Sequence, residues 1–380
     1  HISKNNNLLY SPQLLTLIQN YTHAFFLLIC FAFLGVSNAQ TFNINGHVKG
    51  LPDSSWIFLR PADKNDVIDS AQVLEGRFNL NGRIADEAIQ AMIYTANYKN
   101  YTSFWLQNNV YQIFFNNGQF KQGVILGTDL ETESKIKFGG IRYLYDLQDS
   151  LVSLRKQVKD TTLKAILKTA YKKVDSVLMQ ENIHSIISRP NSLLSANTLN
   201  IYKSGWPKEL VAELYNGFTD KLKQSSFGKD IEQFLRLNKD HKIGDRYTDI
   251  VQPNMQGKMV KLSDIKAKFV LVEFWGSWCG PCREGNPELI ATYNKYKSKG
   301  FEIFGVSVET NKSQWEKAVK EDKIPWENVS ELNGDKNTAT AIYGINGYPS
   351  NFLIDANGFI IAKDLRGAEL TKKLEELLGK

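Results

Sequence analysis

The sequence predicts a multidomain chain in which an all-β sandwich or barrel-like domain and an α-helical segment precede a C-terminal α/β domain. Three observations support this fold class. Short apolar runs with turn dipeptides fill residues 40–130, and apolar residues at three- and four-residue spacing fill 131–240. Over residues 241–380, continuous apolar strands alternate with helical patterns. The 380 residues are enough for two or three cores.

The composition narrows the class of protein. With 42% hydrophobic and 23% charged residues, the chain has the profile of a soluble globular protein. The net charge of +6 is small for this length and is spread along the chain, so we expect no nucleic-acid partner. Three cysteines are too few for a disulfide-stapled scaffold or a cysteine-rich metal protein.

Residues 1–39 are expected to be a signal peptide. Residues 24–36 carry no polar side chain, and a run this short fits the apolar core of a secretory signal better than a membrane span of about 20 residues. Ser37-Asn38-Ala39 then supplies small residues for cleavage. The alternative is an uncleaved membrane anchor. Cleavage would remove Cys30 and leave two cysteines in the periplasm or cell envelope, an oxidising compartment.

Residues 40–130 are predicted to form the small β domain. Apolar runs mark its strands, and turns are expected at Asn45-Gly46, Glu75-Gly76, Asn81-Gly82 and Asn117-Gly118. No catalytic constellation occurs here. The aromatic residues are expected to pack in the core rather than to line a ligand site. They are Trp56, Phe104, Trp105, Phe114 and Phe115.

Residues 131–240 are predicted to form amphipathic helices, interrupted at Pro190 and at Gly205-Trp206-Pro207. The apolar stripe consists of Ile141, Leu144, Leu147, Leu151, Leu154, Val158, Leu163, Ile166, Leu167, Ala170, Val174 and Val177. The lysines between these positions are expected to form a solvated face, and a docking surface for an acidic partner is the less favoured interpretation.

Residues 241–380 are predicted to form a mixed sheet flanked by helices. Residues 269–275 read as a strand covered on both faces, and a helix is expected from the cysteines to about Lys297. Further strands are expected at 301–308, 352–354 and 359–361, and further helices at 315–320 and 368–378. Asn357-Gly358 marks a hairpin between the last two strands.

The string Cys279-Gly280-Pro281-Cys282 carries the chemistry. Two cysteines separated by two residues can close a small strained ring and open it again, and Gly-Pro favours tight entry into a helix. Cys279 is then at the helix N-terminus, where backbone N–H groups and the helix dipole stabilise the thiolate that attacks disulfides. Cys282, one turn inside and expected to be more buried, suits the resolving role.

Two other interpretations of this motif are weaker. Half of a zinc site would need two more ligands, and no histidine follows His241. A purely structural disulfide would not explain the flanking tryptophans or the position at a helix start. We therefore expect redox chemistry, with no metal and no cofactor other than the Cys279–Cys282 disulfide.

Residues 242–380 resemble the thioredoxin-fold thiol-disulfide oxidoreductases of the TlpA/ResA type. The resemblance is carried by the cysteine motif, by Pro287 in the following helix, and by the dipeptide Tyr348-Pro349. It implies that Pro349 is a cis proline of the catalytic site and that the backbone of Tyr348 pairs with substrate. Trp278, Gly280 and Pro281 are further expected substrate contacts.

The resemblance also assigns a role to Glu273. This residue lies six positions before Cys279, where thioredoxins carry a buried acid. Desolvation should raise its pKa and let it accept the proton of Cys282. The alternative is a strand-end carboxylate that reaches solvent. Many relatives carry a glutamate at the position of Gly285, so the role of that acid is not transferred. Trp275 and Trp278 are expected to pack around the disulfide, and the alternative for Trp278 is a flat apolar surface that faces partners.

The region before residue 241 resembles, more loosely, the β domain and helical segment that precede redoxin domains in many Gram-negative envelope proteins. This match rests on the layout and on strings such as Val67-Ile68-Asp69-Ser70 before Gly76-Arg77-Phe78. That β domain has no settled activity to carry over.

Together these features predict an extracytoplasmic disulfide reductase. Its substrates would be disulfide-containing envelope proteins, and a membrane thiol electron donor would restore the dithiol. The alternatives are an oxidase or isomerase with the same residues, or a ligand-binding β domain with an accessory redoxin. A peroxidase is disfavoured, because Gly276 and Val272 occupy the places where peroxiredoxins need Pro and Thr or Ser. The oligomeric state is not predicted.

Overall fold

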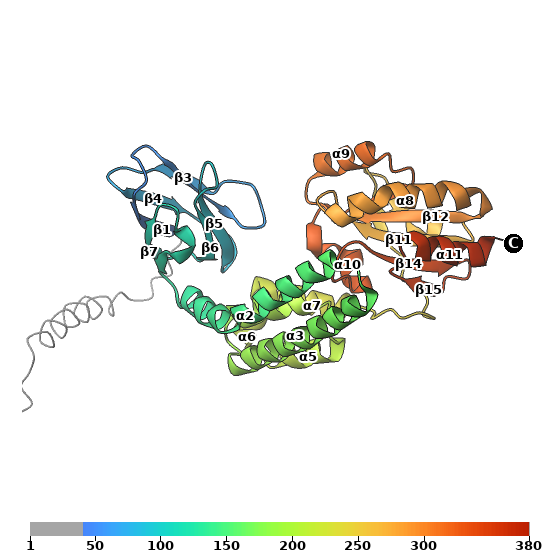
Figure 1. Ribbon diagram of the computed structural model, residues 1–380, viewed down its shortest axis with the longest axis horizontal. Coiled ribbons are helices and arrows are strands. Elements are labelled where there is room, and N and C mark those ends of the chain that lie inside the picture. Colours follow the sequence, from blue (N-terminus) through green and yellow to red (C-terminus); the bar gives the residue numbers. More distant parts are fainter. Residues whose placement is uncertain (1–40, 380) are drawn as a thin grey trace, which may run out of the picture. The chain divides into compact units, whose positions relative to one another are not determined.

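The computed structural model describes residues 41–379 and divides the chain into two compact units, with the boundary between Glu131 and Thr132 (Figure 1). The predicted signal peptide, including Cys30, lies outside the described residues. Within residues 41–379, no helix is both long enough and apolar enough to cross a membrane.

The first unit is built from two sheets, as the sequence predicts. One has the order β4-β1-β7-β8 and the other β3-β2-β5-β6. Inward-facing apolar residues of both sheets form one core, and β1 buries every second residue. The strands are β1 (Phe42–Lys49), β2 (Trp56–Pro61), β3 (Asp69–Gln72), β4 (Arg77–Gly82), β5 (Ile89–Thr95), β6 (Tyr101–Leu106), β7 (Val110–Asn116) and β8 (Val124–Leu126).

Two of the predicted turns are wrong. Asn45-Gly46 lies inside β1, and Asn81-Gly82 ends β4. Phe78 is the cross-strand partner of Gly46, and its ring covers the glycine so closely that a Cβ at residue 46 would lie 2.0 Å from a ring carbon. Glycine here makes room for an aromatic ring on the neighbouring strand. At Glu75-Gly76 both residues have positive φ, as a hairpin turn requires.

The prediction of core packing holds for three of the five aromatic residues. Phe104, Trp105 and Phe115 are buried, whereas Trp56 and Phe114 are exposed. The exposed rings occupy strand positions that face away from the core. Each stacks on a neighbour instead, Trp56 on Phe58 and Phe114 on His47.

The second unit begins with helices separated where prolines were expected to break them. Helix α3 ends before Pro190, and α5 follows Pro207. Asp160, Ser192, Thr219 and Ser225 cap helices with their side chains. The helices are α2 (Asp129–Gln157), α3 (Thr161–Ser188), α4 (Leu193–Tyr202), α5 (Lys208–Asn216), α6 (Asp220–Lys223) and α7 (Ser226–Leu237).

The predicted apolar stripe of α2 and α3 is buried only in part. Ile141 and Leu144 are buried against Leu178, but between Leu144 and Leu178 no side chain is buried. Leu147, Leu154, Leu163, Ile166 and Val177 are exposed. The reason is geometric. Within this unit, the core formed by α4, α5 and α7 includes the C-terminal end of α3 at Ile186 but does not extend along the rest of α2 and α3.

The C-terminal part of the second unit has the predicted α/β architecture, a five-stranded mixed sheet with the order β13-β12-β11-β14-β15. Central β11 (Phe269–Trp275) runs parallel to β12 (Phe301–Ser307) and antiparallel to β14 (Ser350–Asp355). The sheet ends in β13 (Glu327–Val329) and β15 (Ile360–Lys363). A separate hairpin, β9 (Val251–Pro253) and β10 (Met259–Lys261), precedes it.

Helices cover both faces of this sheet (Figure 1). Helices α8 (Gly280–Tyr296), α9 (Lys312–Asp322) and α11 (Gly367–Leu378) contribute to the apolar cluster on one face, which includes both cysteines. Helix α10 (Thr338–Tyr343) contributes to the cluster on the other face. The active-site loop therefore follows the middle strand, β11, which is paired with a neighbouring strand on each side.

Candidate active site

The two cysteines form a disulfide at the start of α8. Their Cα atoms are 5.2 Å apart. Cys279 is the N-cap residue, and its Sγ accepts a hydrogen bond from the backbone N–H of Cys282 at 3.2 Å. Pro281 lies in the first turn, where its missing N–H costs no helical hydrogen bond. In the reduced protein, the same N–H would stabilise a Cys279 thiolate.

The expectation that Cys282 is the more buried cysteine is wrong. Both side chains are 4% exposed and belong to the same apolar cluster. In the disulfide form, burial therefore does not distinguish the two cysteines. The asymmetry that remains is electrostatic, because Cys279 occupies the cap position and Cys282 lies within the first turn.

The two tryptophans beside the motif have different surroundings. Trp275 packs in the cluster that contains the disulfide, and its Nε1 donates to Asn328 at 2.8 Å. Trp278, by contrast, is 57% exposed. Its indole crosses the loop at Gly276, where a Cβ would lie 2.8 Å from the ring. Trp275 therefore packs around the disulfide as predicted, and Trp278 fits the predicted alternative, an apolar surface open to solvent.

A proline lies immediately before β14, the strand that neighbours β11, and close to this apolar surface. The Tyr348–Pro349 peptide bond is cis, as predicted. Ser350, the next residue, pairs with Phe274 near the end of β11, which places the cis bond beside the active-site loop. The rings of Tyr348 and Trp278 meet edge to face at 5.4 Å. Gly280 and Pro281 are exposed as well, so the four predicted substrate contacts are all at least partly accessible.

Glu273 is buried in the central strand, with 6% of its surface exposed, so a solvent-facing carboxylate is ruled out. Asn351 of β14 donates to its Oε2 at 2.9 Å, and Nη1 of Arg366 lies 3.9 Å from Oε1. Burial raises the pKa of Glu273 to about 7, an effect that Arg366 and Asn351 reduce and Asp364 reinforces. Such a carboxyl exchanges a proton near neutral pH.

Three further residues shape the loop and were not found from the sequence. Arg283 forms an ion pair with Asp322 of α9, to which it also donates from Nη2 at 2.7 Å, and it donates to the carbonyl of Ser277 at 3.3 Å. Glu309 accepts a hydrogen bond from the N–H of Ser277. These partners lie 39 and 32 residues apart in sequence, and no local motif links them.

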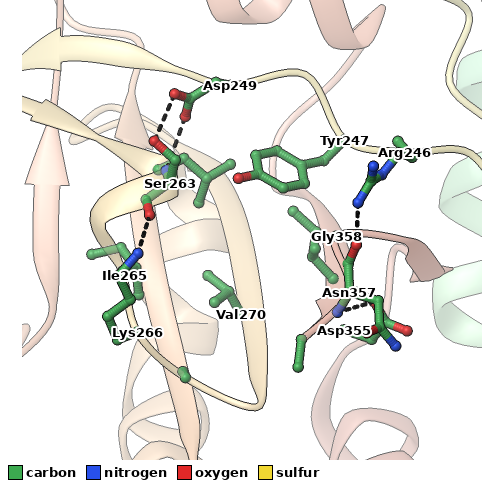
Figure 2. Close-up of a pocket in the computed structure, with 14 residues that line it drawn as sticks. Arg246, Tyr247, Asp249, Ser263, Ile265, Lys266, Val270, Asp355, Asn357 and Gly358 are labelled. Carbon is green, nitrogen blue, oxygen red and sulfur yellow. Dashed lines mark hydrogen bonds between the residues drawn. The ribbon is translucent and has the colours of Figure 1, made fainter.

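A cavity of about 660 Å³ lies elsewhere on the domain (Figure 2). Figure 2 shows Arg246 pointing to the carbonyl of Asn357, and Asp249 accepting hydrogen bonds from the neighbouring Ser263. These polar groups satisfy one another, and none of the predicted site residues lines this cavity.

The geometry now defines a class of protein. A disulfide at a helix N-terminus, a cis proline beside it and a buried acid on the central strand, all in a mixed sheet covered on both faces, form the site of a thioredoxin-fold thiol-disulfide oxidoreductase.

Comparisons with known proteins agree. Residues 243–363 match the AhpC/TSA family, and residues 42–137 match a domain of unknown function, DUF4369. The thiol-disulfide oxidoreductase ResA of Bacillus anthracis is 32% identical over 138 residues, which is 36% of this chain and 78% of that protein. ResA of a Bacillus cereus strain is 29% identical over 167 residues, 44% of this chain and 85% of that protein.

Among solved structures, the thioredoxin domain of a thiol-disulfide oxidoreductase from Bacteroides vulgatus is 38% identical. The match covers 36% of this chain and 99% of that one, with a TM-score of 0.35. The similarity to the sequence relatives shows that the chain belongs to the family of ResA thiol-disulfide oxidoreductases and is itself a thiol-disulfide oxidoreductase.

Proposed function

We propose that the protein reduces disulfides of extracytoplasmic proteins through the Cys279–Cys282 pair. The observation that carries the proposal is the position of the disulfide, at a helix N-terminus, beside the exposed ring of Trp278 and the cis peptide bond of Pro349. An exposed apolar ring beside the backbone segment that leads into β14 suits an unfolded or extended polypeptide, which offers both apolar side chains and free backbone groups.

The reaction proceeds in two exchanges. The Cys279 thiolate attacks one sulfur of the substrate disulfide, forming a mixed disulfide and releasing the other substrate sulfur as a thiolate that takes up a proton. Glu273 then accepts the proton of the Cys282 thiol. The Cys282 thiolate attacks Cys279, which closes the protein disulfide and releases the second substrate thiolate. No cofactor enters these steps, and two electrons pass to the substrate.

The return to the dithiol requires an outside reductant. The described residues and the three cysteines of the sequence offer no second pair that could relay electrons. A membrane-bound thiol donor on the outer side of the cytoplasmic membrane fits this need. The apolar run at 24–36 supports an extracytoplasmic location.

Reduction of insulin by dithiothreitol tests the activity. The protein should accelerate precipitation of the insulin B chain, and Cys279→Ser should abolish the acceleration. A Cys30→Ser variant is the matched control, because it removes a thiol outside the described domains. Equal rates for Cys279→Ser and the unmutated protein would contradict the proposal.

The direction of electron flow needs a separate measurement. Titration of the Cys279–Cys282 pair against glutathione gives its reduction potential. A reductase requires a potential well below that of the strong oxidant DsbA, which is about −120 mV. A value near that figure would instead identify an oxidase with the same residues.

A further inference from the structure

Arg366 connects two parts of the site that come from different elements. It is the N-cap residue of α11, and its guanidinium lies 3.9 Å from Oε1 of Glu273 on β11. Its other terminal nitrogen, Nη2, donates a hydrogen bond to the backbone carbonyl of Pro349. One planar cation therefore contacts both the buried acid and the cis proline, as the fork of an arginine permits.

Hydrogen bonds to β14 hold the backbone immediately before Arg366, and this anchoring positions its guanidinium. Asn351 exchanges hydrogen bonds with Leu365: its Nδ2 donates to the carbonyl at 2.9 Å, and its Oδ1 accepts from the N–H at 3.0 Å. The N–H of Asp364 donates to the carbonyl of Asn351 at 2.9 Å. The same Asn351 Nδ2 donates to Glu273, so one amide aligns the carboxylate and the loop that carries Arg366.

We propose that Arg366 is a positioning residue for thiol-disulfide exchange, which holds the Glu273 carboxylate in its charged, proton-accepting form and ties it to the cis-proline segment that receives the substrate. The inference rests on the proposed proton transfer from Cys282 to Glu273. It adds a residue outside the cysteine motif, the buried acid and the cis dipeptide.

The charges around Glu273 explain why a cation is needed here. The charged groups that act on the carboxylate are Arg366 and Asp364, and Asp364 disfavours ionisation, as burial does. On the other side, β12 places Gly305 opposite Glu273 and contributes no charge. Without Arg366, the carboxyl would keep its proton to higher pH, and the Cys282 thiol would lack an acceptor.

The size of the effect follows from the exposure of the cation. Opposite charges at this distance change a pKa by about 1 to 3, and the Arg366 side chain is 41% exposed, which favours the lower figure. A pKa raised from about 7 to about 8 would lower the ionised fraction of Glu273 roughly tenfold at pH 6 and roughly twofold at pH 8.

Ellman's reagent separates the two exchanges in the full chain carrying Cys30→Ser. The reagent releases one thionitrobenzoate when Cys279 of the reduced protein attacks it. A second is released when Cys282 resolves the mixed disulfide. Stopped-flow absorbance between pH 5.5 and 8 gives both rates. In Arg366→Gln, the second rate should be about tenfold lower at pH 6 and about twofold lower at pH 8, with the first rate changed less than twofold.

Two further variants test whether the effect comes from the positive charge of Arg366. Arg366→Lys keeps the positive charge and should return the pH midpoint of the second step toward that of the unmutated protein. Lys372→Gln removes an exposed charge from α11 and should leave both steps unchanged. A purely structural Arg366 would slow the second step equally at every pH, or would slow both steps, and either result would overturn the inference.

Glu273→Gln distinguishes a failure of the Arg366 role from a failure of the proposed proton transfer to Glu273. If this variant resolves the mixed disulfide slowly but Arg366→Gln does not move the midpoint, the role of Arg366 is wrong and the proposed function stands. If Glu273→Gln resolves at the normal rate at pH 6, the proposed proton transfer itself fails, and the inference fails with it.

Discussion

Replacing Glu273 with Gln should make the oxidised protein more stable at neutral and alkaline pH. The pKa of Glu273 rises from 4.5 to about 7 on folding, mainly because the carboxyl is buried. At 1.36 kcal/mol for each tenfold change in proton affinity, this rise corresponds to about 3 kcal/mol. Gln is close in shape, and its side-chain oxygen can accept the same hydrogen bond from Asn351.

Whether stability rises or falls with pH depends on whether the folded or the unfolded state binds the proton more tightly. Below pH 4.5 the carboxyl is protonated in both states, and Glu273 has no pH-dependent cost. Between pH 4.5 and pH 7 the unfolded chain loses its proton while the folded chain keeps it, so the stability of the unmutated protein falls as pH rises. Above pH 7 the loss is complete, at about 3 kcal/mol.

Urea unfolding at pH 4.5, 6, 7 and 8, followed by tryptophan fluorescence, measures the difference directly. Four of the seven tryptophans lie in the α/β domain that contains Glu273, so the fluorescence reports mainly on that domain; they are Trp275, Trp278, Trp315 and Trp326. The advantage of Glu273→Gln should grow by about 3 kcal/mol from pH 4.5 to pH 8. Glu375→Gln, which changes an exposed carboxylate, should show no comparable growth. A difference between Glu273→Gln and the unmutated protein that stays constant across this range would refute the reasoning.

Three other predictions concern the contacts around the site and the β domain. Trp278→Ala should lower the rate of insulin reduction several-fold and change the free energy of unfolding by less than about 0.5 kcal/mol, because the ring is exposed; an unchanged rate would remove Trp278 from substrate binding. Asp322→Ala should destabilise the oxidised protein by about 1.5 to 3 kcal/mol in urea unfolding, since the Arg283 guanidinium loses a charged hydrogen-bond partner; a loss below about 0.5 kcal/mol would show that the pair is not structural. Gly46→Val should destabilise the β domain by about 1 to 3 kcal/mol because its Cβ would collide with the Phe78 ring, whereas Gly139→Ala, in open space on α2, should not destabilise the chain; equal stabilities of the Gly46 and Gly139 variants in urea would contradict this account.

The sequence predicted the elements whose signals are local. Strand β11 is a continuous apolar run, and α8 begins at a cysteine followed by Gly-Pro, so both were placed within a residue or two. The cis bond at Pro349 and the buried Glu273 followed from the resemblance to a known family. Such features need a motif match, since a glutamate in an apolar strand does not by itself show which way it points.

The features that the sequence missed depend on residues far apart in the chain. Asn45-Gly46 has the composition of a turn, but the ring of Phe78 determines that it is a strand interior. The apolar stripe of α2 and α3 predicts burial, yet burial depends on which neighbours reach it. Arg366 lies 93 positions after Glu273, and the two come together through the pairing of β14 with β11 and β15 and through the hydrogen bonds of Asn351.

The most direct test of the central claim is to trap the first exchange. Cys282→Ala in the Cys30→Ser background, mixed with oxidised insulin and quenched in acid, should accumulate a mixed disulfide. Peptide mapping by mass spectrometry should place the insulin chain on Cys279. The Cys279→Ala variant should accumulate little adduct in the same time. If the adduct instead formed at Cys282 in Cys279→Ala and none formed at Cys279, the assignment of the attacking cysteine would be contradicted.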